Sequence, residues 1–181
     1  MSGFTRRAAV VTGGAGGIGA GIAARLAADG FRAIVLDQAE PAAQVDRFHV
    51  VDLSDAVAVQ ALCARFAAEE EVTCLVNNVG IVCPAPLEEV DPADFDRLLH
   101  VNLRPSILCA QAFLPGMKAA GGGRIVMNTS RVTLGKERRT LYSASKGAAQ
   151  SMARTWALEL GPHGITVNCV APGPIGTDAF W

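Results

Sequence analysis

Short runs rich in β-branched residues alternate with longer Ala- and Leu-rich runs along the whole chain. Each short run is apolar almost throughout, which is typical of strands that are buried on both faces of a parallel sheet. The pattern therefore predicts an α/β fold of the Rossmann type, a doubly wound parallel sheet with helices on both faces. We expect strands within residues 8–13, 33–37, 46–53, 73–80, 122–130 and 164–173.

The longer runs predict helices over residues 17–30, 55–70, 92–119 and 141–160. Asp91 is a good N-cap for the third of these, and Pro92 suits its first position. Pro105 falls inside the apolar pattern of the same helix and should bend it or make it irregular. Gly161 and Pro162 should end the last helix.

Composition narrows the class of protein. The chain has 181 residues, half of them apolar, so we expect one domain over residues 1–181. A net charge of −1 gives no electrostatic basis for binding nucleic acid or an anionic membrane. No apolar run reaches the roughly 18 residues of a membrane span. Five cysteines without a Cys-x-x-Cys pair favour reduced thiols and a cytoplasmic protein, and the three histidines show no metal-ligand spacing.

A glycine-rich segment, "VVTGGAGGIGAGIA", joins the first strand to the first helix. Glycines there permit a tight turn and let a pyrophosphate approach the backbone and the helix N-terminus. Such a loop alone could be a plain turn. Asp37, however, ends the second strand, where its carboxylate can accept hydrogen bonds from the adenosine ribose and would repel a 2′-phosphate. Since the loop contains no arginine or lysine, we expect NAD(H) rather than NADP(H).

The loop spacing, Thr-Gly-x-x-x-Gly-x-Gly, resembles that of the short-chain dehydrogenase/reductase family. Further motifs of the family follow in its order and on the expected elements. They are Asp52-Leu53, "NNVG" at 77–80 with Val79 in place of the usual Ala, Asn102, Ser130, "YSASK" at 142–146, and "PGPIGT" at 172–177.

This resemblance implies which residues bind the cofactor. Asp52 would contact the adenine ring, although a helix cap is an equally reasonable role for it. Thr177 would bind the nicotinamide carboxamide. The full expected set is Thr12, Gly13, Gly17, Ile18, Gly19, Asp37, Asp52, Leu53, Asn78, Gly80, Tyr142, Lys146, Pro172, Gly173, Ile175 and Thr177.

The catalytic residues expected from the resemblance are Asn102, Ser130, Tyr142 and Lys146. A free tyrosine has a pKa of about 10, and the ammonium of Lys146, one helical turn away, should lower it. The resemblance also gives Lys146 a bond to the nicotinamide ribose, Ser130 a bond to the substrate oxygen, and Asn102 a water for proton relay. Thr129 is the alternative hydroxyl to Ser130. Taken singly, each residue could instead be an ordinary core or surface residue.

We therefore expect an NAD(H)-dependent oxidoreductase that interconverts a secondary alcohol and a ketone, with a 3-oxoacyl or hydroxyacyl substrate as one possibility. A non-catalytic nucleotide-binding fragment or pseudoenzyme is the alternative, and a nucleotide-sugar epimerase or dehydratase is a weaker one. A basic stretch at 136–139, "KERR", is expected to be a solvated loop, with attraction of an acidic substrate as its alternative.

The resemblance also implies a C-terminal segment beyond Trp181 that carries a substrate lid and a last strand. We expect the sequence to be part of a longer protein; a natural truncation and a strand supplied by a partner chain are the alternatives. Without that strand, the run at 164–173 becomes an open, apolar edge. Relatives pair their long helices, so a homodimer or homotetramer is expected.

Overall fold

The computed structural model describes residues 7–41 and 44–177, and it contains one six-stranded parallel sheet. The strands are β1 (Ala8–Thr12), β2 (Arg32–Asp37), β3 (Arg47–Val50), β4 (Val72–Asn77), β5 (Gly123–Asn128) and β6 (Ile165–Val170). Their order across the sheet is β3-β2-β1-β4-β5-β6, and every neighbouring pair is parallel. The chain thus winds outward in both directions from β1 and β4, which confirms the Rossmann-type fold.

Five α-helices lie in the described ranges: α1 (Gly17–Ala28), α2 (Ala56–Glu69), α3 (Pro92–Asn102), α4 (Arg104–Ala119) and α5 (Thr140–Leu160). Short 3-10 turns cover Leu87–Glu89, Arg131–Leu134 and Gly161–His163. None of the helices in this part of the chain combines the length and apolarity that a membrane crossing requires.

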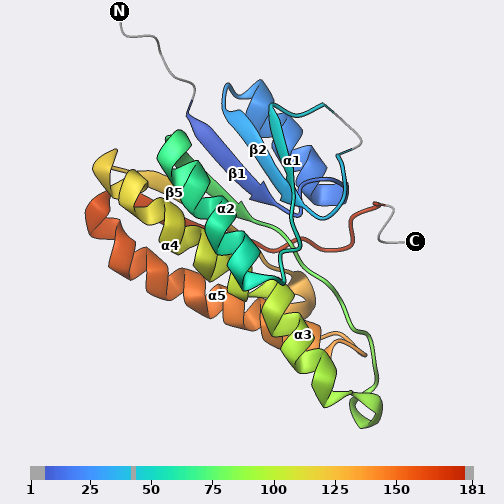
Figure 1. Ribbon diagram of the computed structural model, residues 1–181. Helices are drawn as coiled ribbons and strands as arrows, with labels where there is room; N and C mark the ends of the chain where they lie inside the picture. The colour runs from blue at the N-terminus through green and yellow to red at the C-terminus, as the bar shows by residue number, and fades with distance from the viewer. Residues whose placement is uncertain (1–6, 42–43, 178–181) are drawn as a thin grey trace, which may run out of the picture.

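Helices cover both faces of the sheet (Figure 1). On one face α2, α4 and α5 pack over a core that contains the fully buried Phe66, Phe113 and Met117. On the other face α1 packs through Ala23 and its neighbours. The side chains of successive β1 residues point to opposite faces of the sheet, as the pleat of a strand requires. Val10 therefore packs in the first core and Val11 in the second.

The third predicted helix is divided in two. α3 ends at Asn102, α4 begins at Arg104, and Leu103 between them has φ −123° and ψ −49°. Pro105 has no amide hydrogen and its ring crowds the preceding turn, so the helical hydrogen bonds cannot run through this point. The irregularity expected at Pro105 is confirmed, and it turns the end of α3 toward the segment that follows β4.

Candidate active site

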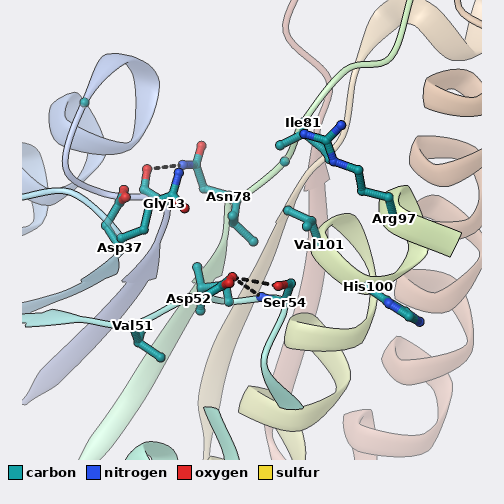
Figure 2. Close-up of a pocket in the computed structure, with 15 residues that line it drawn as sticks. Gly13, Asp37, Val51, Asp52, Ser54, Asn78, Ile81, Arg97, His100 and Val101 are labelled. Carbon is teal, nitrogen blue, oxygen red and sulfur yellow. Dashed lines mark hydrogen bonds between the residues drawn. The ribbon is translucent and has the colours of Figure 1, made fainter. Parts of the chain in front are cut away.

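A cleft of about 720 Å³ opens where the carboxyl ends of β1 and β4 diverge. In a doubly wound sheet, this reversal of strand order is where ligands bind. Figure 2 shows side chains from both halves of the sheet around it. The cleft brings together six of the predicted cofactor residues: Gly13, Asp37, Asp52, Leu53, Asn78 and Gly80. It is also lined by Arg97, His100 and Val101 of α3, which no sequence motif indicated.

The glycine-rich loop fits its surroundings only because it lacks side chains. Gly13 has φ +66°, and a Cβ there would lie 2.8 Å from the Val79 Cα. A Cβ on Gly19 would lie 2.0 Å from the Gly13 carbonyl oxygen. Gly17 opens α1 with φ +52°, and no side chain caps the helix at Gly16. The loop is therefore packed tightly while the first amides of α1 stay available to an anion, as a bound pyrophosphate would need.

Thr12 and Asn78 join the two halves of the sheet beneath the loop. The Thr12 hydroxyl accepts hydrogen bonds from the amides of Asn78 and Val79 at 3.0 and 3.2 Å. The Asn78 side-chain amide donates to the carbonyls of Thr12 and Gly13 at 3.0 and 2.8 Å, and its oxygen accepts from Asn128 at 2.6 Å. Both side chains thus hold the shape of the site, and Ile18, in the first turn of α1, is half-buried.

Two carboxylates stand at the adenosine end of the cleft. Asp37 accepts from the Ala15 amide of the glycine loop at 2.9 Å and from the Ala39 amide at 3.1 Å. Asp52 accepts from the amide and the hydroxyl of Ser54, both at 2.8 Å, and these bonds lower the pKa of Asp52. The helix-cap alternative for Asp52 is wrong, because Asp55 caps α2 through the amides of Val57 and Ala58.

Lys146 is buried at the opposite end of the site. Its ammonium donates to the Asn128 carbonyl at 2.8 Å and lies 5.7 Å from the centre of the Tyr142 ring. Burial lowers the pKa of Lys146 to about 8. A Cβ on Gly80 would come within 3.3 Å of the Lys146 nitrogen, so this glycine leaves room for the ammonium.

Of the two candidate hydroxyls, Ser130 lies beside Tyr142. The Ser130 hydroxyl is near enough to the tyrosine hydroxyl to act against the rise of the Tyr142 pKa, and it accepts from the Val132 amide at 3.2 Å. Thr129 is buried, and its hydroxyl donates to the Val170 carbonyl of β6 at 3.0 Å. The structure therefore groups Ser130, Tyr142 and Lys146 and leaves Thr129 outside the group.

The pKa of Tyr142 departs from the sequence-based expectation. In the protein alone, burial raises the pKa of Tyr142, while the bond with Ser130 and the positive charge of Arg139 act in the opposite direction. The expected lowering by Lys146 is thus wrong for the protein alone: the Lys146 ammonium is directed at the Asn128 carbonyl and not at the Tyr142 hydroxyl.

Asn102 is buried where α3 ends, and its side chain is fully engaged. Its oxygen accepts from the Ile81 amide at 2.8 Å, and its nitrogen donates to the Ile81 carbonyl at 3.1 Å and to Ser145 at 3.0 Å. The side chain therefore anchors the segment after β4. The water for proton relay that the resemblance gives to Asn102 stays a prediction.

The segment after β6 runs from the catalytic end toward the glycine loop. The Pro172 carbonyl accepts from the Arg131 amide at 3.0 Å, and Gly173 lies against the Arg131 guanidinium. Ile175 is exposed. The Thr177 side chain is 3.6 Å from the point that a Cβ on Gly17 would occupy. Thr177 thus lies beside the N-terminus of α1, nearer the expected pyrophosphate than the resemblance implied.

Comparison with known proteins matches this architecture. A sequence profile described as short chain dehydrogenase matches residues 7–181. A D-xylose 1-dehydrogenase of Caulobacter vibrioides is 38% identical over 93% of this chain and 71% of its own. A cis-4-hydroxycyclohexanecarboxylate dehydrogenase of Sinomonas cyclohexanicum is 39% identical over 94% of this chain and 74% of its own.

Solved structures give the same result. A 3-oxoacyl (acyl-carrier-protein) reductase of Agrobacterium tumefaciens C58, solved with NADP bound, superposes with a TM-score of 0.88 at 32% identity. The match covers 96% of this chain and 72% of that one. Fold, strand order and sequence similarity agree, and the chain belongs to the short-chain dehydrogenase/reductase family of oxidoreductases.

Proposed function

We propose that the protein interconverts a secondary alcohol and a ketone with NAD(H), using Tyr142 as the acid and base. The observation that carries this proposal is the grouping of Ser130, Tyr142 and Lys146 next to Gly80, which lines a cleft large enough for a dinucleotide. A bound nicotinamide ring supplies the hydride chemistry. The chain itself has to orient the substrate oxygen and move one proton to or from it.

Each side chain has a role that its surroundings allow. The half-buried Tyr142 hydroxyl takes the alcohol proton during oxidation, and Ser130 donates a hydrogen bond to the same substrate oxygen. Lys146 carries most of its charge at pH 7, since its pKa is about 8. That charge, 5.7 Å from the Tyr142 ring, favours the phenolate once the cationic nicotinamide of NAD⁺ is added beside it.

The proposed preference for NAD(H) rests on the end of β2. The Asp37 carboxylate lines the cleft and is fixed by two backbone amides, so a 2′-phosphate would be placed against a held negative charge. Residue 38 is glutamine, and the loop from Gly13 to Gly19 contains no basic residue. Because a similar solved structure holds NADP, a preference for NADP(H) is the competing outcome. Steady-state kinetics with both cofactors decide it, and Asp37→Ser combined with Gln38→Arg should reverse the preference.

The substrate belongs to the class of small secondary alcohols and ketones. The relatives named above act on a sugar, on a ring hydroxy acid and on 3-oxoacyl groups. Compounds of the 3-oxoacyl or hydroxyacyl class are therefore one group of substrates to be tested.

The five free thiols fit a reducing compartment, so we place the protein in the cytoplasm. We also propose a homodimer or homotetramer, which sedimentation can test.

Turnover with NAD⁺ and a panel of secondary alcohols tests the proposal. Tyr142→Phe should lower kcat by about 10²- to 10⁴-fold while NADH binding, followed by its fluorescence, stays as in the wild type. If the wild type binds NADH and turns over no alcohol or ketone, the non-catalytic alternative holds. Normal turnover by Tyr142→Phe would refute the assignment of the acid and base.

A further inference from the structure

The basic stretch 136–139 between β5 and α5 is not uniformly solvated. Lys136, Glu137 and Arg138 are exposed, whereas Arg139 is half-buried. Arg138 has φ 59°, a left-handed conformation that side chains other than glycine seldom adopt. The chain thus makes a tight turn at Arg138, and the residue after it is directed toward the protein.

Arg139 and Tyr142 belong to the same turn of helix. Arg139 is the N-cap residue of α5, and its carbonyl accepts from the Ser143 amide at 2.7 Å. Residues three apart on a helix lie on one face. The electrostatic effect of Arg139 on the Tyr142 hydroxyl agrees with this placement.

Arg139 also borders the open side of the catalytic group. Its backbone forms an isolated parallel bridge with Ala85, in the segment that follows β4. On the other side of Ser130, Arg131 lies against Gly173. Arg139 thus lies in the loop that leads into Tyr142, and a substrate that enters from the side of this loop would meet it.

The Arg139 guanidinium has no acidic partner within the described residues. One of its nitrogens donates to the Arg138 carbonyl at 3.0 Å, and no carboxylate in ranges 7–41 and 44–177 comes within ion-pair distance. Arg32 and Arg47, also partly buried, both bond to Glu70. The bond to Arg138 lies at an exposed position, so the remaining donors of Arg139 are open to an anion brought by a ligand.

We propose that the substrate carries a carboxylate and that Arg139 binds it, which makes the protein a hydroxy-acid dehydrogenase. This inference rests on the proposed function. A single guanidinium matches a monoanionic carboxylate through two parallel hydrogen bonds, whereas a phosphate dianion would call for further fixed cations. In oxidation, the carbinol hydride goes to NAD⁺ and the hydroxyl proton goes to Tyr142. The carboxylate is unchanged, and the products are the oxo acid, NADH and one proton.

Matched pairs of substrates test the proposal. We would compare 3-hydroxybutanoate, 4-hydroxypentanoate and cis-4-hydroxycyclohexanecarboxylate with their methyl esters, which vary the spacing between hydroxyl and carboxylate and remove the charge. For at least one spacing, the acid should exceed its ester in kcat/KM by about 10- to 100-fold, mostly through KM, as expected for a hydrogen-bonded charge. Arg139→Gln should abolish that ratio and Arg139→Lys should restore part of it. Lys136→Gln, at an exposed site of the same loop, is the matched control.

Several outcomes would overturn the inference. If esters and acids react equally while Tyr142→Phe is inactive, Arg139 does not select a carboxylate and the proposed function stands. Preference for a hydroxyalkyl phosphate over the acids would replace carboxylate by phosphate. If no alcohol reacts, quenching of NADH fluorescence by the corresponding oxo acids and oxo esters decides: binding that Arg139→Gln leaves unchanged, or no binding of the acids at all, refutes the proposal.

Discussion

Burial acts on Tyr142 and Lys146 in opposite ways at one site. It raises the pKa of the phenol and lowers the pKa of the ammonium, because the neutral form of each is favoured away from water. The protein alone is therefore not poised for alcohol oxidation at neutral pH. If the reaction is the proposed one, the cation that redresses the balance comes with NAD⁺, and we expect cofactor binding and activation of the proposed base to be coupled.

Tyr142 is the only tyrosine in the chain, so its ionisation can be observed directly. In a pH titration of ultraviolet absorbance, the protein alone should show a tyrosinate transition above the ordinary pKa of 10, since burial raises the pKa of Tyr142. Saturation with NAD⁺ should move that transition to lower pH, whereas NADH should move it less. Tyr142→Phe, which has no phenol, is the blank. An unchanged transition with NAD⁺ would contradict the coupling.

Lys146 should lower the stability of the fold that it serves. Its pKa falls from 10.5 to about 8, so the unfolded chain binds more protons between these values and stability rises with pH there. Below pH 8 Lys146 is protonated in both the folded and the unfolded chain, so the full destabilisation of the fold by the buried charge remains. Lys146→Met should therefore increase the free energy of unfolding at pH 7 by about 1–2 kcal/mol, after allowance for the lost bond to Asn128.

Denaturant unfolding at several pH values tests this expectation. The advantage of Lys146→Met over the wild type should shrink as pH rises from 8 to 10.5, and the variant should lose activity at every pH. A variant that is less stable than the wild type at pH 7, or an advantage that grows with pH, would contradict it.

At the scale of elements, the sequence predicted all six strands and the α-helical segments of the described ranges, though not the short 3-10 turns, because each of the longer elements carries a local signal. Pro105 likewise predicted the break between α3 and α4. Local signals could not place Arg97, His100 and Val101 in the cleft, since that depends on the direction α3 takes after the break. The roles of residues at the strand ends were also harder to predict from the sequence. Thr129 and Ser130 differ in role because only the Thr129 hydroxyl bonds to the last carbonyl of β6.

Asn102, at the break between α3 and α4, connects α3 to Ile81 in the segment after β4 and to Ser145 of α5. Asn102→Ala would leave both backbone groups of Ile81 without their partner and remove one of the two bonds of the Ser145 hydroxyl, and unsatisfied buried groups are destabilising. We expect a loss of about 2–3 kcal/mol in unfolding free energy and a lower kcat with NADH binding retained. Asn168→Ala, on the exposed face of β6, should change neither quantity. Equal effects of the two substitutions in denaturant unfolding and kinetics would refute an anchoring role.

At the scale of the whole molecule, the sheet divides the work of the site between its halves. β1, β2 and β3 lead into the glycine loop, Asp37 and Asp52, while the proposed catalytic group comes from the end of β5 and the start of α5. Thr12 and Asn78 join the halves with bonds between residues far apart in the sequence. No sequence pattern signals such a pair as a contact, so this level of organisation emerges only when the chain is folded.

A second long-range contact holds the outer strands to the rest of the molecule. Glu70, just after α2, has only 6% of its side chain exposed and bonds to Arg32 of β2 at 2.7 Å and to Arg47 of β3 at 2.9 Å. Removing the Glu70 charge would leave Arg32 without its acidic partner, whereas Arg47 would keep its ion pair with Glu69 at 2.8 Å. Glu70→Gln should therefore lower the free energy of unfolding by about 2–4 kcal/mol.

The surface pair Arg25–Asp29 of α1, with 77% and 47% of its side chains exposed, provides the control. Asp29→Asn should change stability by less than about 0.5 kcal/mol, as measured in the same denaturant experiment. Because β2 carries Asp37 and β3 leads into Asp52, Glu70→Gln should also weaken NADH binding, whereas the rate of hydride transfer at saturating cofactor should stay near the wild-type value. If stability falls and NADH binding does not, the adenosine end of the cleft is held by the glycine loop and Thr12 alone, and the Glu70 cluster stabilises only the edge of the sheet.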